Sequence, residues 1–203
     1  MKALDPIQQS ALSEVGNIGA GHVASTLADL VGHRVSITVP KVWVASPANL
    51  PEGMNHGVPM VATHFKVLGE PSGGILFALT KENASKLLGL ILEKQTPSNG
   101  DWTELEFANL KEAGLILCAS YLEALNQLMH LRLIPSIPKI LSGGMEKVLE
   151  GAFLQPANSL DGRIGVLNQF REDSSGVEGF FFFVPEPEGL HLILERLGVL
   201  VSK

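Results

Sequence analysis

The sequence is short of cysteine and of long apolar runs, and each shortage excludes a class of protein. Its 203 residues contain one cysteine, Cys118, so neither an intramolecular disulfide nor a Cys-cluster zinc site can form. The longest apolar runs, such as 180–184, fall far short of the roughly 20 residues that a membrane span needs. The opening MKALDPIQQ lacks the apolar stretch of a secretory signal. We therefore expect a cytoplasmic protein that does not associate with membranes.

Clustered positive charge is also missing. The net charge is −6 and no run of Lys or Arg occurs, so nothing supplies the counterion displacement on which nucleic-acid binding draws. The six histidines show no metal-ligand spacing such as HExxH. Cys118 lies in the apolar stretch LILCAS, which favours a buried structural thiol over a nucleophile. We expect no nucleic-acid partner and no cofactor or metal bound by the chain itself.

What the sequence does contain is a regular alternation of helical and strand patterns. Asp5, Pro6 and Gln8 are the cap, first residue and capping-box partner expected of a long helix that stops at Gly32. Helices are predicted over about 6–31, 80–93, 101–130 and 190–197, the third opened by Asp101 or Thr103. Strands are predicted over 34–39, 60–68, 73–79, 163–169 and 179–184, with strand-like residues before Pro138 and a looser stretch over 142–151.

The second half of the chain repeats the first. At an offset of 98 residues, 9 of the 33 residues in 10–42 are identical, where roughly two would be expected from composition. A weaker echo matches 74–77 with 179–182 at an offset of 105. We predict one domain made of two repeats, about 1–97 and 98–203. Its fold class is α/β, with two long and several shorter helices on a shared mixed or antiparallel sheet, related by a pseudo-two-fold axis.

The first predicted helix carries a polar line opposite its apolar side. At 100° per residue its apolar positions gather on one side, among them Leu12, Val15, Val23, Leu27 and Leu30. The opposite side carries residues spaced by four, three and four positions, which therefore form one continuous line: Ser10, Glu14, Asn17 and Gly21. Burying the apolar side against the sheet would expose this line.

The helix alone does not make this line a site, because an exposed Glu and Asn are ordinarily a solvated surface. Gly16, Gly19 and Gly21 are less ordinary, since each costs roughly 1 kcal/mol relative to Ala inside a helix. They indicate either close packing of the helix on its own protein or close approach of a partner. Such glycines also occur in phosphate-binding loops, but those loops follow a strand and open a helix. Here the glycines lie in the middle of a helix that no strand precedes, so we do not expect a nucleotide site.

Ser10, Glu14, Asn17 and Pro40 are spaced in a way that resembles the sequence pattern of the CheC/CheX/FliY family of chemotaxis phosphatases. The family pattern is Asp or Ser, three residues, Glu, two residues, Asn, 22 residues and Pro, and Ser10, Glu14, Asn17 and Pro40 fill its four places. The flanking GNIGAG and VPKV are also similar to the family, which is itself duplicated in this way. The resemblance covers nearly the whole chain.

The resemblance implies a phosphatase that hydrolyses the aspartyl phosphate of a CheY-like response-regulator receiver domain. Asn17 would orient the attacking water, Glu14 would pair with a receiver Lys, and Gly21 would let the receiver approach the helix backbone. Mg²⁺ is expected on the receiver substrate. A CheD-like deamidase is a further possible partner in such a family.

The second half departs from the family pattern. The matching places hold Ala108, Glu112, Leu115 and Pro138, so the Glu and Pro persist while the Ser and Asn are replaced. Leucine can neither donate a hydrogen bond to water nor accept one. We predict a single-site member with a degenerate second site at Glu112 and Leu115. The alternative is a non-catalytic receiver-binding adaptor or a flagellar-switch-type interaction module.

Overall fold

Caps, turns and apolar periodicity in the sequence form five helices and eight strands in the part of the chain that the structure describes. The computed structural model describes residues 4–45, 57–93, 102–153 and 163–200. The helices are α1 (Pro6–Val31), α2 (Lys81–Leu92), α3 (Glu104–Met129), α4 (Met145–Phe153) and α5 (Pro187–Arg196). The strands are β1 (Val35–Ile37), β2 (Lys41–Ala45), β3 (Met60–Leu68), β4 (Gly73–Thr80), β5 (Ile134–Pro135), β6 (Lys139–Gly143), β7 (Arg163–Glu172) and β8 (Glu178–Pro185).

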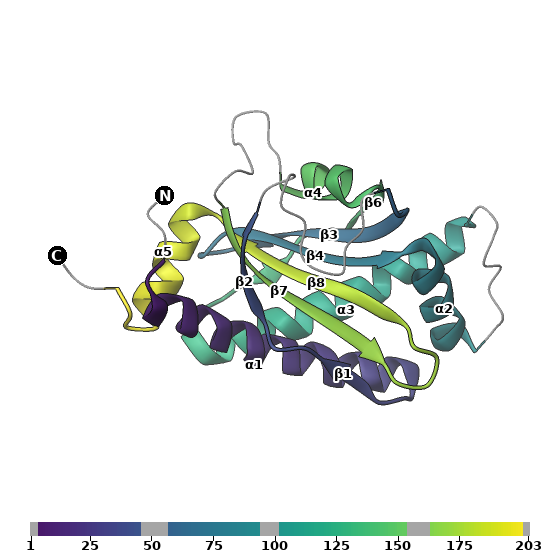
Figure 1. The fold of residues 1–203 in the computed structure, drawn as a ribbon, viewed down its shortest axis with the longest axis horizontal. Coiled ribbons are helices and arrows are strands. Elements are labelled where there is room, and N and C mark those ends of the chain that lie inside the picture. Colours follow the sequence, from purple (N-terminus) through teal and green to yellow (C-terminus); the bar gives the residue numbers. More distant parts are fainter. Residues whose placement is uncertain (1–3, 46–56, 94–101, 154–162, 201–203) are drawn as a thin grey trace.

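One sheet joins all eight strands, and every described pairing in it is antiparallel. The main path runs β1-β7-β8-β4-β3-β5, with β2 also paired to β7 and β6 to β3. The long helices α1 and α3 cover one face together with α2 and α5, and α4 lies on the other face (Figure 1). The molecule is therefore a helix–sheet–helix sandwich, as the predicted α/β fold class requires.

The centre of the sheet has apolar side chains on both faces. Phe181 and Phe183 of β8 pack under α1 and α3, whereas Phe180 and Phe182 pack under α4. All four are buried, as is typical of a central strand that is covered on both faces. Burying a Phe side chain is worth roughly 1.5–3 kcal/mol, so this strand fixes the sheet between its two helical layers.

The element order of the first half recurs in the second. α1 and α3 each have 26 residues and start 98 residues apart, and β2 and β6 are also 98 apart. β1 and β2 pair with β7 of the other half, and β5 and β6 pair with β3 in the same manner. Each half therefore completes the sheet of the other. The boundary near residue 97 falls outside the described residues, so that division stays a prediction.

Three details of the structure differ from the sequence expectations. The strand expected over 34–39 does end before Pro40, at Ile37, but β2 was not expected, and its Lys41–Ala45 pairs with β7 after the proline. The looser stretch 142–151 contains most of α4, whose Met145, Val148, Leu149 and Phe153 are buried at helical spacing. Neighbouring glycines at 143, 144 and 151 hide that period in the sequence.

The offset of 105 between the central strands is the third error. It matches Ile75 with Phe180, but Ile75 faces the long helices and Phe180 faces α4. A slip of one residue moves a strand side chain to the opposite face of the sheet. Matching Ile75 with Phe181, 106 residues on, keeps both on the same face.

Candidate functional site

Helix α1 is fixed at both ends by local sequence. The Asp5 side chain accepts a hydrogen bond from the Gln8 backbone N–H at 2.9 Å, and the Gln8 side chain accepts one from the Asp5 backbone N–H at 3.2 Å. This is the predicted capping box, with Pro6 in the first turn. Gly32 ends the helix at φ 70°, a left-handed conformation that glycine adopts without steric cost. The two caps fix where the helix begins and ends, and its period of 3.6 residues then determines which residues share each side.

The buried side of α1 is the predicted apolar side. Leu12, Val15, Val23 and Leu27 are at most 1% exposed and join the core beneath α3 and the sheet. Thr26 lies beside α3, where its hydroxyl shares a 2.7 Å hydrogen bond with that of Ser120. With this side committed to the core, the opposite side of the helix is held toward solvent.

The line Ser10, Glu14, Asn17 and Gly21 is exposed along its whole length, as the helical spacing predicts. No described residue makes a hydrogen bond or ion pair with the side chain of Glu14 or Asn17. The Asn17 amide therefore keeps its oxygen acceptor and its two N–H donors available to water or a partner. The arrangement offers a carboxylate and an amide, one helical turn apart, to whatever docks on α1.

The three glycines of α1 have different surroundings. A Cβ on Gly16 would lie 3.1 Å from Cβ of Pro40 and closer still to Val166, and one on Gly19 would lie 2.6 Å from Cδ2 of Tyr121. These two glycines therefore allow close packing within the protein. A Cβ on Gly21 would meet nothing within 4 Å, so internal packing does not explain this glycine.

Pro40 is buried against α1, between β1 and β2. Its contact with the backbone at Gly16 holds the strand connection against the helix that carries the polar line. The neighbouring Val39 is 79% exposed, an apolar side chain held out to solvent at the same strand connection. The structure therefore places Pro40 as a support of the site and not as part of its surface.

The matching face on α3 is also exposed but carries different chemistry. Ala108 and Glu112 are exposed, Leu115 is 37% exposed, and Pro138 is half-buried. Leu115 is therefore not a core residue. Gly114 packs against Thr63 of β3 as Gly16 packs against Val166 of β7. The α3 face keeps the carboxylate of the α1 face without its amide.

Both faces also share exposed apolar residues, which sequence reasoning missed. Ile7 on α1 and Leu105 on α3 are each 67% exposed, and they are 98 residues apart. Val39 has its counterpart in Ile137, which is 89% exposed at the same offset. The repeat offset of 98 residues shows from the sequence that the two residues of each pair correspond. It does not show that they are exposed, because the exposure of an apolar residue is not visible in sequence.

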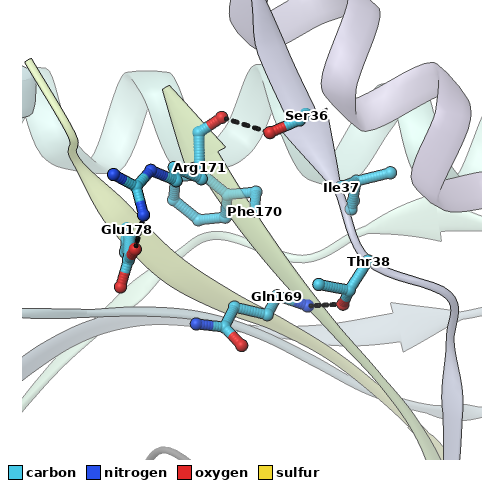
Figure 2. A pocket seen from close by; sticks show the side chains of 7 residues that line it. All are labelled: Ser36, Ile37, Thr38, Gln169, Phe170, Arg171 and Glu178. Carbon is cyan, nitrogen blue, oxygen red and sulfur yellow. Dashed lines mark hydrogen bonds and ion pairs between the residues drawn. The ribbon is translucent and has the colours of Figure 1, made fainter. Parts of the chain in front are cut away.

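A shallow groove of about 280 Å³ follows the junction of β1 with β7 (Figure 2). Apart from the Gln169 side-chain amide, its polar side chains already bond within the sheet. The Ser36 hydroxyl donates to the Arg171 carbonyl at 3.2 Å, and the Gln169 N–H donates to the Thr38 hydroxyl at 3.1 Å. Arg171 pairs with Glu178 at 3.0 Å. The groove thus offers no free charge to a ligand.

Among the described residues, no three His, Cys, Asp or Glu side chains are placed to share a metal ion. Cys118 is fully buried, and burial raises the pKa of its thiol, as expected of a structural cysteine. Within the described ranges, no helix combines the length and apolar character that crossing a bilayer demands. Of the six histidines, His56 lies outside the described residues, so the statement on metal ligands does not cover it.

The chain is similar to known proteins in both sequence and fold. The model of the CheC-like family matches residues 7–44, which contain the polar line and Pro40. The CheY-P phosphatase CheC of Bacillus subtilis is 32% identical over 196 residues, covering 94% of each chain.

Solved structures show the same fold. FliY of Thermotoga maritima is similar with a TM-score of 0.72 at 18% identity, covering 97% of this chain and 98% of that one. A complex of CheX with CheY, BeF3 and Mg²⁺ from Borrelia burgdorferi contains a chain similar with a TM-score of 0.55 at 15% identity, covering 84% and 97%.

Proposed function

The chain belongs to the CheC-like family, and from that premise we propose that it hydrolyses the aspartyl phosphate of a CheY-like receiver domain. The observation that carries the proposal is the exposed pair Glu14 and Asn17, free of described partners on a helix fixed by caps and core. Support also comes from the similar B. subtilis protein, which is named a CheY-P phosphatase.

The proposed hydrolysis of the aspartyl phosphate requires an oriented water. Hydrolysis of an acyl phosphate proceeds when water attacks phosphorus in line with the departing Asp oxygen, and such transfers depend on positioning and charge compensation. In the proposal, the Asn17 amide oxygen accepts a hydrogen bond from the water, which leaves a water lone pair directed at phosphorus. Mg²⁺ belongs to the receiver and would compensate the phosphoryl charge. This chain would supply no covalent step.

Glu14 has the docking role in the proposal. Its exposed carboxylate, one turn from Asn17, is placed to pair with a receiver Lys. A Glu–Lys pair at an interface sets register and association rate more than affinity. Ile7 and Val39, both largely exposed, would supply apolar contact area around that pair. Ser10 and Gly21 would border the docked surface.

The test is a dephosphorylation time course on phosphorylated candidate receivers, with wild type compared with Asn17→Ala. We expect Asn17→Ala to return the decay to the receiver's own rate while binding is largely preserved, because the water is no longer held. Glu14→Ala should weaken both binding and hydrolysis. Leu115→Ala is the matched control and should leave the rate nearly unchanged, since Leu115 is surface-exposed and cannot hold a water. Equal decay with wild type and Asn17→Ala would show that the assignment of Asn17 is wrong.

A non-catalytic adaptor or flagellar-switch-type module is the second candidate, and the similarity to FliY fits it as well. Such a module would bind the receiver without accelerating its decay, so the same time course separates the two functions. A CheD-like deamidase as regulatory partner, and a cytoplasmic location, stay predictions.

A further inference from the structure

A small pocket lies on the α4 side of the sheet, opposite the face that carries α1. Its volume is about 150 Å³, and strand ends and the C-terminal residues of α4 surround it. Its walls include His64 and Lys66 of β3, Phe153 of α4 and Arg163 of β7. None of these residues belongs to the polar line of α1.

Arg163 is the unusual residue in this pocket. It is 9% exposed, and none of the residues in 4–45, 57–93, 102–153 and 163–200 makes a hydrogen bond or ion pair with its side chain. A buried charge without a partner is costly, and buried charges in proteins are ordinarily paired. The other arginine of β7, Arg171, is exposed and nevertheless has a partner, Glu178, at 3.0 Å. Arg163 thus lines the cavity with unused donors.

Neighbouring charges make the pocket electropositive. Lys66 lines it, and Lys139 of β6 stands opposite His64 in the strand register. Burial, together with the charges of Lys139 and Lys66, lowers the pKa of His64 to about 4. Among the described residues that line the pocket, one carboxylate, that of Glu186, opposes these cations, and its Oε2 already accepts a hydrogen bond from Ser72 at 3.3 Å.

The space itself is maintained by a glycine. A Cβ on Gly74 would lie 2.8 Å from Cε1 of Phe153 and 3.1 Å from Nε2 of His64, so no larger residue fits there without displacing the rings. The volume is below the roughly 300–1,000 Å³ typical of small-molecule sites. It admits a tetrahedral oxyanion with a few waters but not a nucleotide.

We propose that this pocket binds a small oxyanion of the phosphate class, with the Arg163 guanidinium as its principal ligand and Lys66 as a second cation. A guanidinium presents paired N–H donors that match the oxygens of such anions. The ligand would give the mostly buried Arg163 guanidinium an anionic partner. Because the site lies across the sheet from Asn17, its occupancy does not depend on the proposed hydrolysis.

The test is calorimetric titration of the full chain with inorganic phosphate at constant ionic strength. We expect saturable binding of one phosphate, weakened at least tenfold by Arg163→Gln. Glu186→Gln should tighten binding, because it removes the opposing charge. Arg171→Gln is the matched control on the same strand and should leave the affinity unchanged.

A second measurement keeps the test independent of one variant. Phosphate should shift the NMR signals of the His64 ring in wild type and not in Arg163→Gln. Should Arg163→Gln fail to fold, the tightening by Glu186→Gln still carries the test. Unsaturable binding, affinity unchanged in either pocket variant, or acetate binding as tightly as phosphate would each overturn the proposal.

Discussion

At the scale of single residues, Asn17 and Leu115 stand at matching places on the two long helices, and only Asn17 can hold a water. Leu115 is 37% exposed, so its replacement by a polar residue leaves the core intact. We expect Leu115→Asn, introduced into Asn17→Ala, to restore part of the accelerated decay, because Glu112 and the exposed Leu105 and Ile137 are already present on that face. Leu128→Asn, on the same helix at 39% exposure, is the control. Activity no higher than that control would show that the α3 face does not dock a receiver productively.

Glu172 is a residue-scale determinant of acid stability. Burial would raise the pKa of its carboxyl, but hydrogen bonds from Ser174 and Ser175, including backbone N–H bonds of 2.7 Å, outweigh burial and lower it to about 2. Since the folded pKa lies below the unfolded value, this stabilisation is complete above about pH 4.5 and is lost as the pH falls toward 2. Glu172→Gln should lower the free energy of unfolding by on the order of 1–3 kcal/mol at pH 7. It should also flatten the loss of stability between pH 5 and 2 in urea unfolding, whereas the exposed Glu195→Gln should not.

At the scale of the element, α1 serves both packing and the site, and its glycines separate the two roles. We expect Gly21→Ala to raise the free energy of unfolding by about 0.5–1 kcal/mol, because the position is open and alanine is the better helix former. The same change should weaken receiver binding if a partner approaches the backbone there. Gly16→Ala is the contrasting variant and should destabilise by roughly 1–3 kcal/mol through overlap with Val166 and Pro40. Urea unfolding with receiver-binding titrations measures both effects, and unchanged binding by Gly21→Ala would remove Gly21 from the docking surface.

At the scale of the whole molecule, each half of the chain lends strands to the other. β7 receives β1 and β2, and β3 receives β5 and β6, so the central strands β4 and β8 lie between two matching outer groups. α1 and α3 then pack side by side over one face, which presents the polar line of α1 and its altered counterpart on α3 as parts of one helical layer (Figure 1). A duplicated fold of this kind can lose the chemistry of one half without losing its packing.

The sequence by itself determined the ends of α1, the exposed line on α1 and a strand near 179–184, because caps, helical period and apolar runs act over a few residues. It also predicted the repeat, since an offset of 98 residues is visible in identities. It missed α4, whose period is interrupted by glycines, and it missed β2 after Pro40. It also missed the offset of 106 in the central strands, because the face of a sheet that a residue occupies depends on pairing register.

Only the tertiary structure decided which glycines of α1 pack internally and which one is open. It alone brought Arg163 beside His64 and Lys66, which are about 100 residues away in sequence. Such assignments rest on contacts between distant segments, and single-sequence patterns carry no information about those contacts. The roles of Glu14 and Asn17 in catalysis stay predictions, supported by their exposure and by the family to which the chain belongs.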